Sequence, residues 1–240
     1  MVIVPLYDKD PLERDTVPYV TYGLIAANVL IFLCELGLAQ KADDAFSQAL
    51  AFVPARFAEN PFGGAIPGIV TLVSYAFLHG GWMHIGGNML FLWVFGDNIE
   101  DAMGHARFLV FYLLCAIAAA LVFMLSDPQA TTLLVGASGS IAGIVAAYLM
   151  LRPCAKIEVL FFVIPLAIDA YLALGGWIVV QVWHVVIGAQ DGTAWWAHVG
   201  GLIAGALLVT IMRRADVELF QCVHPVTLIK QMVGRPDRGR

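Results

Sequence analysis

The chain has 240 residues, of which 60% are hydrophobic and 13% are charged, and its formal net charge is −5. A soluble domain usually carries about 25% charged residues, so the composition favours a polytopic membrane protein over a soluble bundle. The few charges are spread thinly, which argues against a nucleic-acid partner. No basic segment with a cleavage site precedes the first apolar run, so no signal peptide is expected.

Residues 1–16 are polar and are expected to form a short arm outside the membrane. Six apolar runs follow that are predicted to cross a ~30 Å hydrocarbon core as helices. They cover residues 17–39, 80–95, 108–125, 133–151, 170–187 and 195–212. The predicted fold class is therefore all-α, with a six-span domain over residues 17–214 and a polar tail over residues 215–240.

Three further segments lie between these runs. The connection 40–68 is unusually long, which often marks a functional loop, and its residues 45–57 form an amphipathic stretch expected on the membrane surface. The apolar run 69–78 is interpreted as interfacial or as the approach to the second span. Pro165 and Asp169 interrupt the run 159–187, so residues 159–169 are expected to form an interfacial lead-in to the fifth span.

The basic residues predict the orientation of the six spans. If the N-terminus lies inside, 11 of the 13 basic residues are internal and 2 are external. The external pair is Lys41 and Arg56. The internal ones are Lys9, Arg14, Arg107, Arg152, Lys156, Arg213, Arg214, Lys230, Arg235, Arg238 and Arg240. The positive-inside rule thus predicts that both termini are internal and that the long first loop is external.

The four cysteines are Cys34, Cys115, Cys154 and Cys222. Their spacing fits neither a metal site nor a disulfide framework. They are interpreted as small buried hydrophobic residues, and no metal is expected.

Spans two, four and six would all run inward, so the polar residues near their starts would share one depth near the outer face. Ser138 lies near the start of span four and His198 near the start of span six, and together they supply a nucleophile and a general base. His84 and Asn88 share one face of span two. With the Ser138 amide, they are candidates for stabilising an oxyanion. Because the nearest acids lie in loops or at the opposite face, a Ser–His dyad is expected rather than a triad.

Two pairs of glycines favour close contact between spans four and six. Gly139 and Gly143 on span four, and Gly201 and Gly205 on span six, form small-x-x-x-small patterns that allow helix backbones to approach closely. Such contact would bring Ser138 within reach of His198.

Three motifs resemble the signatures of rhomboid intramembrane serine proteases. They are Gly136-Ala-Ser-Gly139, Ala197-His-Val-Gly200 and the series His79, His84 and Asn88. The resemblance runs from about residue 17 to residue 214 and includes the turn motif Glu100-x-x-x-Gly104.

This resemblance implies a rhomboid-like six-helix bundle with Ser138 as nucleophile and His198 as general base. It assigns the stabilisation of the oxyanion to His84, Asn88 and the Ser138 amide. It assigns supporting roles in the site to His79, Gly136, Gly139 and Gly201. The implied activity is hydrolysis of a peptide bond in or near a transmembrane segment of another membrane protein, without a cofactor. The compact six-span form implies the bacterial inner membrane.

Two departures from the family pattern affect the site. Many members carry a tyrosine one turn after the serine, where it stacks on the base, but this chain has Ala142. Another group must then orient His198. The Trp-Arg pair common in the first loop is absent, and Pro54-Ala-Arg56 stands in that region.

Two other functions fit the sequence less well. An inactive rhomboid-like protein that binds membrane clients would lack the serine or the histidine, and both are present. A small transporter or channel would carry polar groups through the bilayer depth or an internal repeat, and the sequence has neither pattern.

Overall fold

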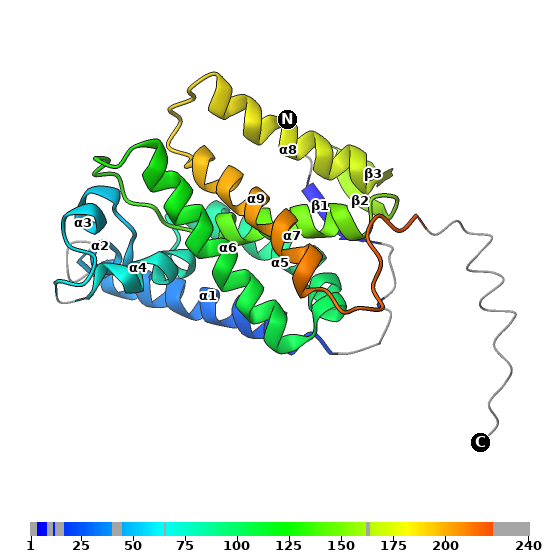
Figure 1. Ribbon diagram of the computed structural model, residues 1–240, viewed down its shortest axis with the longest axis horizontal. Helices are drawn as coiled ribbons and strands as arrows, with labels where there is room; N and C mark the ends of the chain where they lie inside the picture. The colour runs from blue at the N-terminus through cyan, green and yellow to red at the C-terminus, as the bar shows by residue number, and fades with distance from the viewer. Residues whose placement is uncertain are drawn as a thin grey trace, which may run out of the picture.

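The computed structural model describes residues 4–8, 12, 17–39, 45–64, 66–161 and 164–222. This part of the chain forms a helical bundle with short helices at one end and a small β-sheet at the other (Figure 1). The long helices are α1 (Tyr19–Ala39), α5 (Trp82–Met103), α6 (His105–Ser126), α7 (Ser138–Leu151), α8 (Ala170–Val186) and α9 (Trp195–Met212). The short ones are α2 (Ala45–Leu50), α3 (Pro54–Glu59), α4 (Gly68–Ser74) and the 3₁₀ turn η1 (Tyr75–Phe77).

Among the described residues, three helices are long and apolar enough to cross a membrane. They comprise residues Tyr19–Gly37 of α1, all of α6 and all of α9. Helices α7 and α8 are apolar but have only 14 and 17 residues. The mostly helical, membrane-type architecture is therefore confirmed, whereas the count of six spans stays a prediction.

Helix α5 extends beyond the predicted second span, which was expected to end before the polar cluster 96–101. It continues to Met103 because Glu100 is buried and has partners there. The Glu100 carboxylate accepts hydrogen bonds from the backbone N–H groups of Val20 and Thr21, at 2.9 and 2.7 Å, and from the Thr21 hydroxyl. Since the first N–H groups of a helix have no intrahelical partner, Glu100 caps α1 from a neighbouring helix.

The expectation of an all-α fold is wrong in one region. Strands β1 (Val4–Asp8), β2 (Lys156–Phe161) and β3 (Ile164–Asp169) form an antiparallel sheet in the order β1-β2-β3. The predicted N-terminal arm supplies β1, and the predicted interfacial lead-in supplies the end of β2 and all of β3. In β2, Ile157 and Val159 are buried and alternate with more exposed neighbours, which is the period of a strand with one covered face.

The centre of the bundle is the contact between α7 and α9 (Figure 1). A Cβ added at Gly201 would overlap the carbonyl group of Gly139, and one added at Gly205 would overlap the backbone of Gly143. On its other side, Gly139 packs against Ala119 of α6. The predicted close approach of these two helices through paired glycines is therefore confirmed.

The cysteines differ from the prediction. Cys115 is buried, as expected, whereas Cys34 is exposed. Cys154 and Cys222 form a disulfide across 68 positions of sequence. The bond joins the turn after α7 to the segment that follows α9, whose Phe220 N–H donates to the Met150 carbonyl at 2.7 Å. This segment covers the first part of the predicted polar tail, and residues 223–240 lie outside the described residues.

Candidate functional site

Ser138 is the first residue of α7 and follows a tightly held turn. The turn begins at Gly136, whose φ of +114° lies in a region that non-glycine residues rarely adopt. The Gly136 N–H donates to the Tyr75 carbonyl at 2.9 Å. The preceding segment is anchored by Leu134, which exchanges two backbone hydrogen bonds with Phe52. The serine is therefore presented at a helix N-terminus by a fixed backbone.

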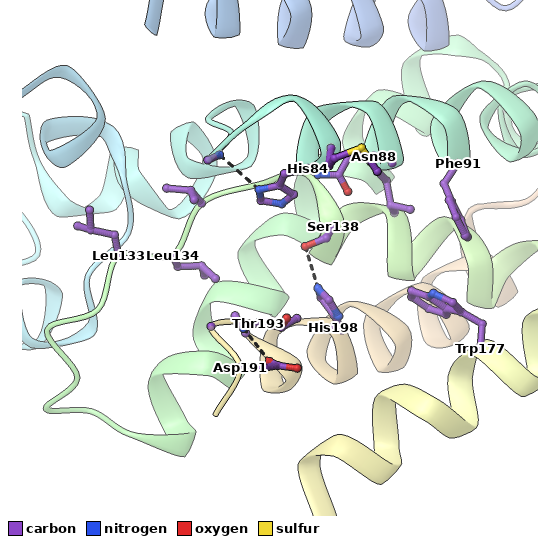
Figure 2. Close-up of a pocket in the computed structure, with 17 residues that line it drawn as sticks. His84, Asn88, Phe91, Leu133, Leu134, Ser138, Trp177, Asp191, Thr193 and His198 are labelled. Atoms are coloured by element: carbon purple, nitrogen blue, oxygen red, sulfur yellow. Dashed lines mark hydrogen bonds between the residues drawn. The ribbon is translucent and has the colours of Figure 1, made fainter. Parts of the chain in front are cut away.

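His198 lies in the first turn of α9 and is 9% exposed. Its Nε2 atom is 2.9 Å from the Ser138 hydroxyl oxygen (Figure 2). The close contact of α7 and α9 explains this distance, since Gly139 and Gly201 each lie within a few residues of the pair. The structure thus brings together the two residues that the sequence proposes as nucleophile and base, at the distance that proton transfer requires.

Helix α8 supplies two contacts to the His198 ring that the sequence motifs do not predict. The Gln181 side-chain oxygen is 2.7 Å from His198 Nδ1. The Trp177 ring stacks on the imidazole, with centroids 6.3 Å apart and planes 26° apart. A signal for Gln181 was present, because an amide within an apolar run usually faces the bundle interior.

His84 and Asn88 line the same site from α5, on the opposite side of Ser138 from His198 (Figure 2). Asn88 is 7% exposed, and its side-chain Nδ2 is buried without a hydrogen-bond partner. His84 Nδ1 accepts a long hydrogen bond, at 3.4 Å, from the Gly80 N–H. His79 is buried, and its ring meets that of His84 edge to face at 5.1 Å. A free donor beside a serine hydroxyl is the arrangement that oxyanion stabilisation needs.

Gly136 creates room for these groups. A Cβ at this position would lie 2.5 Å from His84 Nε2 and 3.6 Å from Asn88 Nδ2. The glycine is therefore required both by the backbone conformation and by the side chains that face it.

A cavity of about 540 Å³ opens over the serine. Polar groups of α5, α7 and α9 meet apolar walls there, and Figure 2 shows the lining residues. The walls come from Met83, Phe91, Leu133, Leu134, Val135, Ile141 and Trp177. The volume lies in the range of ligand pockets, and polar groups converge at its base, so this cavity is the candidate binding site.

The loop before α9 forms one rim of the cavity. Asp191 accepts hydrogen bonds from the Thr193 N–H and from the Trp195 indole, both at 3.0 Å. The Thr193 N–H is the main reason that the pKa of Asp191 lies below its usual value. Within the described ranges, no group of His, Cys, Asp and Glu side chains is placed to hold a metal ion.

The comparisons with known proteins agree on one family. The family model described as "Rhomboid domain" matches residues 67–215, which is more than half of the chain. The chain is 32% identical to "Rhomboid protein 1, mitochondrial" of Saccharomyces cerevisiae over 148 residues, which cover 58% of this chain and 40% of the yeast protein. It is 28% identical to "Rhomboid-like protein 11, chloroplastic" of Arabidopsis thaliana over 163 residues, covering 62% of this chain and 54% of that protein.

A shorter match, 36% identical over 78 residues, links the chain to "RHOMBOID-like protein 5" of Arabidopsis thaliana and covers 32% of this chain and 25% of that protein. The matched regions thus span about half or less of these relatives' own lengths. The family model and the apolar helices together indicate an integral membrane protein. The chain belongs to the rhomboid family.

Proposed function

We propose that the protein is an intramembrane serine endopeptidase that cleaves transmembrane segments of other membrane proteins. The observation that carries the proposal is the 2.9 Å contact between Ser138 Oγ and His198 Nε2 at the base of a cavity. A serine hydroxyl is a weak nucleophile unless an adjacent base takes its proton, and this contact supplies that base. Family membership supports the same activity.

The reaction is acyl transfer in two steps. In the first, Ser138 Oγ attacks the carbonyl carbon of the scissile peptide bond while His198 Nε2 accepts the hydroxyl proton. The unpartnered Asn88 Nδ2 and the N–H groups at the start of α7 are the candidate donors to the oxyanion. His198 then gives the proton to the departing amine, which leaves an acyl-serine.

In the second step, water attacks the acyl-serine carbonyl carbon, and His198 accepts one of its protons. The ester bond to Ser138 breaks, and the proton returns to Ser138 Oγ. The substrate is proposed to be a helix that unwinds near the outer face, where small residues let its backbone extend. This chemistry uses side chains of the chain itself and calls for no cofactor.

We further propose that six helices cross the bilayer, comprising α1, α5, α6, α7, α8 and α9, with both termini inside. The asymmetry of basic residues supports this orientation. It places Ser138, His198 and the loop rim near the outer face. The bacterial inner membrane is the compartment that the resemblance to six-span rhomboid proteases implies. Reporter fusions to each predicted loop would test the topology.

Cleavage of a single-span reporter protein in reconstituted vesicles tests the function. The wild-type protein is expected to cut the reporter, whereas Ser138→Ala and His198→Ala are expected to leave it intact while remaining folded. Cleavage by Ser138→Ala at the wild-type rate would refute the assignment. Binding of transmembrane reporters without cleavage by the wild type would instead indicate an inactive client-binding protein.

A further inference from the structure

Gln181 occupies an isolated buried position on α8. The other buried residues of this helix are Ala170, Ala173 and Leu174, all within its first five positions. Gln181 is 4% exposed and lies seven residues further along, between neighbours that are more exposed. Burying an amide costs free energy unless it is hydrogen-bonded, so the partners of this side chain explain why it is there.

Those partners fix which end of the amide faces His198. The Gln181 Nε2 group lies 3.3 Å from the Trp177 carbonyl oxygen, which accepts hydrogen bonds and cannot donate them. The amide nitrogen therefore belongs on the Trp177 side, and the amide oxygen faces His198 Nδ1 at 2.7 Å. The orientation follows from the hydrogen-bond network rather than from the shape of the side chain alone.

An oxygen at this position selects one form of the neutral imidazole. Because the Gln181 oxygen only accepts, His198 Nδ1 must carry the ring proton. Nε2 then bears the lone pair, and it is the nitrogen that lies 2.9 Å from the Ser138 hydroxyl. This is the form in which His198 can accept a proton from the serine.

The same helix also holds the face of the ring. Trp177 stacks on His198, while Trp195 meets it edge to face with centroids 5.7 Å apart. Trp177 packs against the small buried cluster that contains Ala142. The imidazole is thus fixed in its plane by Gln181 and across its face by Trp177.

We propose that Gln181 is the positioning residue for His198, acting through the Nδ1 contact to set the tautomer and orientation of the base. This assignment rests on the proposed protease function. Gln181 touches neither Ser138 nor the reacting bond in this scheme, and it supplies no charge. It orients the ring as the acid of a serine-protease triad does, but with a neutral acceptor.

The test measures the rate at which a fluorophosphonate probe labels Ser138 in the detergent-solubilised 240-residue protein. Gln181→Met keeps the approximate volume but replaces the amide oxygen with a thioether sulfur, a much weaker acceptor. It is expected to lower the maximal labelling rate at least tenfold, with probe affinity unchanged. That loss is part of the 10²- to 10⁴-fold that a general base contributes. Gln181→Glu keeps an acceptor oxygen toward Nδ1 and is expected to label faster than Gln181→Met.

Val182→Met is the matched control, because it places the same new side chain on the exposed face of α8, one position along. It should label at the wild-type rate. If Gln181→Met does not fold, Gln181→Asn serves in its place, since it keeps the amide but is one carbon too short to reach Nδ1. The melting temperature of each variant shows whether it is folded.

Wild-type rates in Gln181→Met or Gln181→Asn would overturn the proposal. Equal slowing in Gln181→Glu and Gln181→Met, with both folded, would also overturn it, because the acceptor would then not matter. If the folded wild type itself fails to label, the proposed protease function fails. If the wild type labels and the Gln181 variants label equally well, only the role of Gln181 fails.

Discussion

Gly201 of α9 packs directly on the carbonyl group of Gly139 of α7, one residue after the serine. No side chain fits between the two backbones there. The distance between Ser138 and His198 therefore depends on glycine at this crossing. Helix packing and the proposed chemistry are coupled at one point of the bundle.

Gly201→Val is expected to destabilise the fold by about 3 kcal/mol or more, because the new Cβ would overlap backbone atoms that have no alternative position. Thermal unfolding in detergent measures the effect. Gly23→Val is the control, since a Cβ at Gly23 of α1 meets no atom within 4 Å. Equal melting temperatures for the two variants would mean that α7 and α9 do not cross at these glycines.

Asn88→Ala is expected to slow cleavage about 10²-fold, the cost of removing one oxyanion donor. The Nδ2 group has no hydrogen-bond partner in the resting protein, so its removal should leave the melting temperature nearly unchanged. Asn60→Ala, in an exposed loop, should change neither quantity. An unaltered cleavage rate in Asn88→Ala would remove this residue from the oxyanion site.

Gly136→Ala is expected to abolish cleavage and to destabilise the fold by about 1–3 kcal/mol. The backbone strain comes from its positive φ, and the loss of activity comes from a Cβ placed 2.5 Å from His84 Nε2. Gly188→Ala separates the two effects, because Gly188 also has a positive φ, of 62°, but no atom within 4 Å of a Cβ. That variant should lose stability and keep its cleavage rate.

Glu100→Gln is expected to destabilise the fold by about 3 kcal/mol. The two carboxylate oxygens accept hydrogen bonds from the Val20 and Thr21 N–H groups. In the Gln variant an NH₂ group replaces one of these oxygens, and this donor would face an N–H donor without an acceptor between them. Glu59→Gln, on the exposed surface of α3, is the matched control. The fraction of the Glu100→Gln variant that remains folded should still label with the serine probe, since this cap lies on a different part of α5 from the site.

The long apolar helices could be predicted because their composition alone marks them, and the predicted sixth span agrees with α9 at both ends. The end of α5 could not be predicted, because it depends on the hydrogen bonds of Glu100 to another helix. The sheet was missed for a related reason. Strand β1 lies in a polar arm and pairs with β2 about 150 positions away along the chain.

At the site, local motifs predicted Ser138, His198 and Asn88, which the fold brings to one cavity. The paired glycines indicated how α7 and α9 meet. Gln181 was missed because nothing in its own neighbourhood specifies a histidine 17 positions later as its partner. Cys154 and Cys222 likewise show a pairing that only the folded chain brings together. Contacts between segments that are distant in the sequence cannot be predicted from hydrophobic periodicity and local motifs.

The most direct test of the account is to label the detergent-solubilised protein with a fluorophosphonate probe and locate the adduct by peptide mass spectrometry. The account predicts an adduct on Ser138 in the wild type and none in Ser138→Ala or His198→Ala, with all three proteins folded. An adduct on a different serine, or equal labelling of Ser138 when His198 is replaced, would contradict it.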